Sequence, residues 1–166
     1  MRPLLWWAIG GAAVFLAAAV VVGWLDGRMA ETVPLIGSAI VLEAQPAAAL
    51  SIPLGFGPVA GALVSILANL VPLPIMIVAL PDIINRWGWA RRQVERATRV
   101  TRRYQRFGVL SFVVLAPFLG AYACVAVGIT LGWRMLRVLP AVMAGMVASV
   151  GLIVFGGNWA VHLFLH

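Results

Sequence analysis

Apolar residues fill most of the chain in five long stretches, and charged residues are concentrated between them. The stretches cover residues 4–25, 33–55, 57–80, 108–131 and 138–161. Each of them is long enough to cross about 30 Å of hydrocarbon as a helix. These runs are too long and too continuous to be the buried faces of helices in a soluble protein. The pattern therefore predicts an all-α integral membrane protein that forms a single membrane domain over residues 1–166.

Two stretches, 33–55 and 108–131, differ from the other three because polar and helix-breaking residues interrupt them. The interrupting residues are Glu43, Gln45, Pro46, Pro117, Gly120 and Tyr122. Such residues are tolerated at membrane depth where the segment is buried in protein or lines a cavity. We therefore expect them to form a substrate or proton site, together with Asn69 of the third stretch.

The arginines distinguish between two ways of threading the stretches through a membrane. Eight of the twelve arginines lie in residues 82–106, and a positively charged loop is retained on the cytoplasmic side. If all five stretches crossed the membrane, Arg134 and Arg137 would lie outside, against this rule. If the two interrupted stretches instead enter and leave by the same side, every cluster of arginines is cytoplasmic. The near-neutral loop 26–32 is then outside, so the charges favour re-entrant hairpins.

This threading predicts an inverted repeat. Residues 4–25 form an N-terminal transmembrane helix, which precedes the repeat. Residues 33–80 form a re-entrant hairpin followed by a transmembrane helix, and residues 108–161 form the same unit in the opposite direction. Many secondary transporters are built in this way, with a site at the midplane where the broken helices meet.

Residues 82–107, between the two repeats, are predicted to form a cytoplasmic amphipathic helix. One face is apolar, and the other carries Arg91, Arg92, Arg96, Arg99, Arg102, Arg103 and Arg106. A helix of this kind lies in the plane of the headgroups, where arginines contact anionic lipids. Two interpretations remain open: an anchor that only fixes the topology, and a lipid-sensing or regulatory element.

Composition narrows the class of protein further. The chain is 63% hydrophobic and 10% charged, with a net charge of +7. Its basic residues are confined to loops between apolar segments, which argues against a nucleic-acid partner. The single cysteine, Cys124, excludes an intramolecular disulfide and a cysteine-based metal site. No motif of a hydrolase or of a phosphate-binding enzyme occurs, so we expect no catalysis, cofactor or metal.

Glu43 is the most informative single residue, because it is the one acidic residue inside an apolar stretch. A carboxyl group at that depth is costly and usually faces a cavity or a partner. One interpretation is a proton-coupling or cation-contacting group. The other is a protonated acid that hydrogen bonds to carbonyls of the broken helix. For Asn69, we expect the amide to serve carbonyls that Pro72 and Pro74 leave free.

The motifs of the first half resemble the small multi-drug export protein family, and through it the wider DedA-like superfamily of re-entrant-hairpin membrane proteins. That pattern runs from an acidic residue through a glycine to Asn-x-x-Pro-x-Pro, and Glu43, Gly55, Asn69, Pro72 and Pro74 match it in register. In the second half, Pro117, Gly128 and the stretch 132–135 are similar to the second DedA hairpin and its exit. For DedA-like proteins the resemblance implies translocation of lipid carriers, often linked to protons.

This chain also departs from the pattern at four positions. Gln45 stands where the family usually has an arginine, and a proline expected near Ala49 is absent. Two arginines typical of the second DedA hairpin would fall at Val114 and Gly120. The fold implied by the resemblance therefore carries over better than the activity.

The sequence thus predicts a multi-pass protein of the bacterial inner membrane. The leading function is a small transporter or flippase-like protein for an amphipathic or lipid-linked substrate, with proton coupling through Glu43 as one interpretation of that residue. The alternative is a non-transporting accessory or scaffold subunit of a larger membrane complex, which the missing arginines favour. Expected partners are membrane lipids, with anionic headgroups at the basic loop, and a homo-oligomer or larger complex.

Overall fold

The computed structural model describes residues 2–86, 88, 92 and 105–165, and these residues form helices joined by short turns. The helices are α1 (Arg2–Leu25), α2 (Met29–Leu42), α3 (Ala44–Ser51), α4 (Pro58–Leu70), α5 (Pro72–Arg86), η1 (Gln105–Leu110), α7 (Ser111–Leu119), α8 (Ala121–Thr130) and α9 (Met135–Leu165). The predicted interfacial helix 82–107 lies mostly outside the described residues. Of its seven arginines only Arg92 and Arg106 lie among the described residues, and the side chain of Arg92 is exposed. The amphipathic helix and its lipid contacts stay predictions.

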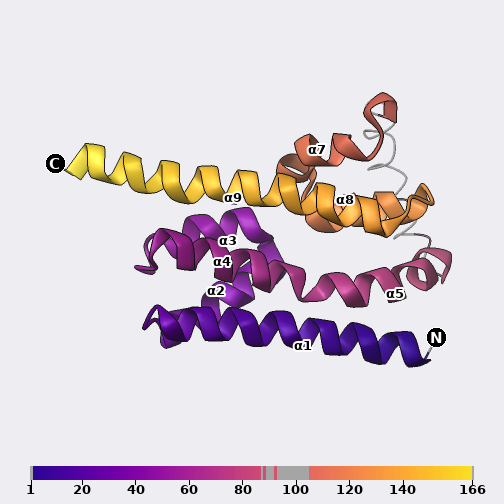
Figure 1. Cartoon of the computed structure of the whole chain (residues 1–166), viewed down its shortest axis with the longest axis horizontal. Coiled ribbons are helices and arrows are strands. Elements are labelled where there is room, and N and C mark those ends of the chain that lie inside the picture. The colour runs from indigo at the N-terminus through magenta and orange to yellow at the C-terminus, as the bar shows by residue number, and fades with distance from the viewer. Residues whose placement is uncertain (1, 87, 89–91, 93–104, 166) are drawn as a thin grey trace.

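Three long helical segments lie side by side along the molecule: α1, the pair α4–α5, and α9 (Figure 1). The pair α4–α5 is in the middle, because α4 contacts both α1 and α9. Among the described residues, three segments are long and apolar enough to cross a membrane, namely Leu4–Leu25, Pro58–Pro81 and Met135–Gly156. The prediction of an all-helical chain with three long apolar helices is therefore confirmed.

The middle segment bends where α4 gives way to α5. Pro72 has no N–H, so it cannot bond to the carbonyl of Ala68 as a regular helix would require. The N–H of Val71 bonds to that carbonyl instead, at 3.2 Å. Val71 keeps a right-handed helical conformation, so the chain continues in much the same direction.

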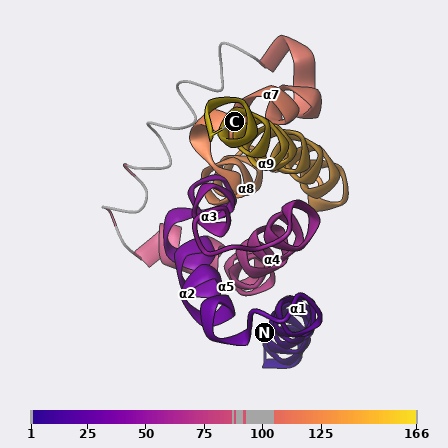
Figure 2. The same cartoon turned by 90° about the vertical axis from the view of Figure 1, so that its left-hand side faces the viewer.

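Two pairs of shorter helices, α2–α3 and α7–α8, pack against these long segments (Figure 2). Their packing is reciprocal: α3 contacts α9 of the second half, whereas α8 contacts α5 of the first half. The first pair is divided at Glu43 and the second at Gly120. The α2–α3 junction lies between the two ends of the bundle rather than at either end (Figure 1).

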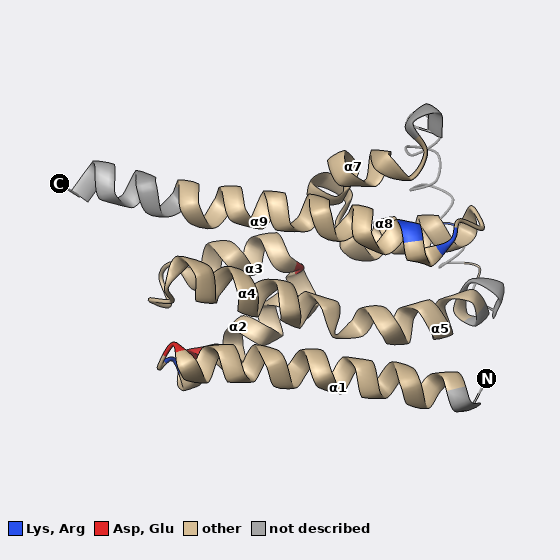
Figure 3. Cartoon of the chain, in the orientation of Figure 1, with Lys and Arg blue, Asp and Glu red and all other residues tan. Residues whose placement is uncertain are grey.

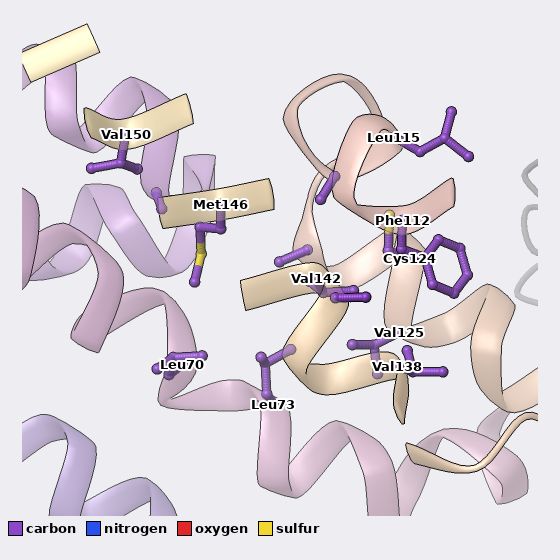
Figure 4. Packing of buried hydrophobic residues seen from close by; sticks show 14 of the residues in the cluster. Leu70, Leu73, Phe112, Leu115, Cys124, Val125, Val138, Val142, Met146 and Val150 are labelled. Atoms are coloured by element: carbon purple, nitrogen blue, oxygen red, sulfur yellow. The ribbon is translucent and has the colours of Figure 1, made fainter. Parts of the chain in front are cut away.

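Two clusters of buried apolar side chains hold the bundle together. One joins α1, α2, α3 and α4, with Leu35 and Val64 fully buried. The larger one joins α7, α8 and α9 to the α4–α5 bend (Figure 4). There Phe112 of α7 and Val142 of α9 are fully buried, and Leu73 reaches the same cluster from α5. Small residues such as Ala44 and Ala48 let the helices approach closely.

The outer surface of the bundle is strongly apolar. Trp7, Phe118 and Leu136 expose more than four-fifths of their side chains, and Leu152 is 77% exposed. A soluble monomer rarely exposes so continuous an apolar surface. Together with the three long helices, this surface fits a protein surrounded by lipid.

The charged residues that the structure describes lie mainly at the two ends of the bundle (Figure 3). Asp26, Arg28 and Glu31 are at the α1–α2 turn, and Arg134 and Arg137 are where α9 begins. These two places are at opposite ends of the bundle (Figure 1). The exception is an acidic residue between α2 and α3, away from both ends.

Candidate substrate site at the broken helices

Glu43 and Gly120, which divide the two short helix pairs, share an unusual backbone conformation. Glu43 has φ 77° and ψ 174°, and Gly120 has φ 84° and ψ 159°. This region is populated almost only by glycine, because a Cβ atom crowds the backbone there, at a cost of about 1–3 kcal/mol. Glu43 is the one non-glycine residue with positive φ in the part of the chain that the structure describes. Such a conformation persists only where surrounding contacts enforce it.

The enforcing contact is made by the Glu43 side chain. Its carboxylate Oε2 accepts a hydrogen bond of 3.1 Å from the backbone N–H of Ala121, and the N–H of Tyr122 also donates to the carboxylate. These N–H groups belong to the first turn of α8, where they have no partner within their own helix. The negative charge also lies at the positive end of the α8 dipole. Glu43 thus caps a helix that lies 78 residues further along the chain.

The partners of Glu43 differ from those that the second interpretation of the sequence expects, while proton coupling stays a prediction. A protonated acid would donate a hydrogen bond to a carbonyl, whereas the described partners of Glu43 are backbone N–H donors. The carboxyl group is only partly buried. It joins the two halves of the chain through hydrogen bonds from the first turn of α8.

Gly120 is required by the same contact. A Cβ atom at this position would overlap the carboxylate of Glu43. The arginine that the DedA pattern has at position 120 is thus incompatible with this packing. The other missing arginine would fall at Val114, whose side chain is 63% exposed on the outside of α7.

The last carbonyls of α2 are capped by side chains from two other helices. The amide Nδ2 of Asn69 donates to the carbonyl of Ala39 at 3.1 Å, and the hydroxyl of Tyr122 donates to the carbonyl of Ile40 at 3.1 Å. The expectation for Asn69 was wrong in its partner: the amide serves the broken end of α2, not the carbonyls freed by the prolines near it. Within the described residues, its buried Oδ1 has no hydrogen-bond partner.

Gln45 adds a weaker link between the halves. Its Nε2 lies 3.4 Å from the carbonyl of Ala116 in α7 and 3.4 Å from the hydroxyl of Ser149 in α9. Both distances are longer than a typical N–H···O hydrogen bond. Ser149 is a residue that the sequence analysis missed, because a lone serine in an apolar helix carries no distinguishing signal.

The two prolines of the predicted site lie within short helices, Pro46 in α3 and Pro117 in α7. Pro46 lies in the first turn of α3, where its missing N–H costs little, and its side chain is exposed. Pro117 lies inside α7 and cannot bond to the carbonyl of Val113. That carbonyl lies against Gly145 of α9, where a Cβ atom would overlap it. Pro117 and Gly145 together let α7 and α9 pack closely.

The structure therefore brings five of the seven predicted residues to the broken ends of the helices: Glu43, Gln45, Asn69, Gly120 and Tyr122. Each half caps a helix of the other half: Glu43 accepts from an N–H at the start of α8, and Tyr122 donates to a carbonyl at the end of α2. In the described part of the chain, no three His, Cys, Asp or Glu side chains lie close enough together to hold a metal ion. The arrangement can bind and release a proton at one carboxylate that joins the two halves.

Comparison with known protein families gives one match. The family model described as "Putative small multi-drug export protein" matches residues 43–153, which is well over half of the chain. The match begins at Glu43 and includes both helix breaks, α4, α5 and most of α9. No curated protein and no solved structure matches the chain.

Proposed function

Since this chain belongs to the small multi-drug export protein family, we propose that it is a proton-coupled membrane transporter for an amphipathic or lipid-linked substrate. The family suggests export rather than an enzymatic reaction. The observation that carries the proposal is the hydrogen bonding of the Glu43 carboxylate to the first turn of α8. It supports Glu43 as the coupling group, with Gln45, Asn69 and Tyr122 lining the same site.

The coupling would work through the charge of Glu43. In its ionised form the carboxylate accepts hydrogen bonds from the α8 N–H groups and holds the two helix breaks together. On taking up a proton it loses the negative charge that these N–H groups and the helix dipole favour. The breaks at Glu43 and Gly120 can then separate, and the strained backbone at Glu43 favours that separation. Loss of the proton restores the joined state, so proton binding alternates two arrangements of the halves.

We further propose that α2–α3 and α7–α8 are re-entrant hairpins of an inverted repeat, as in DedA-like proteins, in a bacterial inner membrane. The matching backbone conformations of Glu43 and Gly120 support the repeat. So does the reciprocal packing of α3 on α9 and of α8 on α5. With Arg134 and Arg137 on the cytoplasmic side, the α1–α2 turn faces outward.

Labelling of single cysteines tests this topology, in a chain whose Cys124 has been replaced by alanine. Cysteines at Arg134 and Arg92 are expected to react with a membrane-impermeant maleimide only from the cytoplasmic side. A cysteine at Glu31, in the α1–α2 turn region, is expected to react only from the outside. Labelling of the Arg134 and Arg92 positions from opposite sides would contradict the re-entrant arrangement and require α7–α8 to cross the membrane.

Transport itself is tested with the purified protein in proteoliposomes across an imposed pH gradient. The probes are ethidium, which is an amphipathic cation, and a fluorescent short-chain phosphatidic acid, which represents a lipid-linked substrate. We expect movement of at least one probe above the level of empty vesicles, and its loss when an ionophore dissipates the gradient. Movement of neither probe, or equal movement without a gradient, would contradict proton-coupled transport of this substrate class.

A further inference from the structure

A pocket lies where η1 and the start of α9 meet, away from the Glu43 site. It has a volume of ≈ 630 Å³ and is lined by Gly108, Val109, Gly132, Trp133, Arg134 and Arg137. A space of that size accommodates a small organic ligand rather than a single ion. It combines two arginines with the apolar surfaces of a tryptophan and a valine.

The turn between α8 and α9 builds one wall of this pocket. The N–H of Gly132 bonds to the carbonyl of Ile129, and the N–H of Trp133 bonds to the carbonyl of Gly128, each at 3.0 Å. This is the Schellman arrangement that ends a helix, and it needs the positive φ of 67° that Gly132 adopts. The position of Trp133 is thereby set by the backbone.

The Trp133 ring is also held in place by the core. Its centroid lies 5.3 Å from that of Phe112, with the two ring planes inclined by 56°. Phe112 is fully buried in the cluster between α7, α8 and α9. An aromatic pair in this tilted geometry is favourable beyond the area it buries. The Trp133 side of the pocket is therefore held by contacts within the protein.

The pocket also has two cationic lining residues, Arg134 and Arg137. The carbonyl of Arg134 accepts hydrogen bonds from the N–H groups of Arg137 and Val138, so α9 begins directly after Arg134. Arg134 and Arg137 are three residues apart, which puts their side chains on one face of the first turn. Both side chains are exposed. In the described part of the chain, neither has a carboxylate partner.

From this combination we infer that the pocket binds a phosphate-bearing anion. Two arginines can each offer paired N–H donors to phosphate oxygens, which is the geometry that distinguishes arginine from lysine. The positive end of the α9 dipole adds to the attraction. The tryptophan and valine surfaces suit an ester whose organic part is apolar, such as the glycerol and first acyl carbons of a phospholipid. A soluble phosphate ester shares the phosphate chemistry but lacks that apolar part.

The test measures binding to the purified full chain in a neutral detergent, by native mass spectrometry titration. The ligands are dioctanoyl phosphatidic acid, glycerol phosphate, and dioctanoylglycerol, which has the same acyl chains without the phosphate. We expect dioctanoyl phosphatidic acid to bind and dioctanoylglycerol to bind much more weakly. Binding of glycerol phosphate as tight as that of the lipid would identify a soluble ester as sufficient. Binding of the lipid alone would identify a headgroup with its acyl chains.

Two matched substitutions separate the pocket from general charge attraction. Arg137→Gln should weaken binding of dioctanoyl phosphatidic acid about tenfold or more, because a charge-assisted hydrogen bond is lost. Arg28→Gln removes the same charge from an exposed arginine at the α1–α2 turn, at the other end of the bundle, and should change binding by less than about twofold. Arg137→Lys keeps the charge without the paired donors and should be intermediate, which also provides a test if the glutamine variant does not fold.

Three results would overturn the inference. The first is equal binding of dioctanoylglycerol and dioctanoyl phosphatidic acid. The second is an equal loss of affinity in Arg28→Gln and Arg137→Gln. The third is wild-type affinity in both Arg134→Gln and Arg137→Gln. The site does not depend on transport, so it can be present whether or not Glu43 couples protons.

Discussion

A Gly120→Ala variant is expected to lose much of its folded stability, with an unfolding free energy lowered by at least about 2 kcal/mol. Two effects add. Alanine at φ 84° and ψ 159° is strained, and its Cβ atom would overlap the carboxylate of Glu43. The carboxylate must move, so the first N–H groups of α8 lose their acceptor. The measurement is thermal unfolding of the purified protein in detergent, followed by circular dichroism.

Gly37→Ala is the matched control for this substitution. Gly37 is an exposed residue inside α2, and a Cβ atom there would meet nothing within 4 Å. Alanine is the better helix former, so this variant should be as stable as the wild type or slightly more stable. Adding Glu43→Ala to Gly120→Ala removes the overlap but not the backbone strain, and should restore part of the loss. An unfolding temperature of Gly120→Ala equal to that of the wild type would refute the close contact of Glu43 with Gly120.

Glu43→Gln is expected to abolish proton-coupled transport while leaving the protein folded. The glutamine side chain has the same length and keeps one oxygen that can accept from the N–H of Ala121, but it cannot bind or release a proton. Transport in proteoliposomes should therefore fall to the level of empty vesicles throughout roughly pH 5 to 9. The unfolding temperature should stay close to that of the wild type.

Glu43→Leu serves as the comparison, because it removes the acceptor as well as the proton. The α8 N–H groups are then left without a partner, which costs about 1–3 kcal/mol. We expect both variants to lose transport and only the leucine variant to lose stability. This result would distinguish the role of Glu43 in proton coupling from its role in capping α8. Wild-type transport by Glu43→Gln at every pH would eliminate proton coupling. If the wild type itself moves neither probe, the accessory or scaffold subunit becomes the better explanation.

The long-range partners of the site residues were beyond sequence analysis. Glu43 is recognisable as an unusual acid, but its partners at Ala121 and Tyr122 are 78 and 79 residues away. A carboxylate in an apolar segment can face a cavity, a cation or a helix end, and only packing selects among these. The same reason explains the error over Asn69, whose nearby prolines offered plausible partners. The amide instead reaches Ala39, because α4 packs against α2.

The sequence predicts where the long apolar helices lie, that Pro117 and Gly120 interrupt the fourth apolar stretch, and which family the chain resembles. These features depend on local properties: continuous hydrophobicity, the conformational freedom of glycine, and motifs read in order along the chain. The tertiary structure places the break of the first pair at Glu43 rather than at Pro46. A glutamate has no intrinsic preference for φ 77°, whereas a proline in a first helical turn costs little. The strain at Glu43 is accepted because its carboxylate caps α8, an interaction that exists only once both halves have packed together.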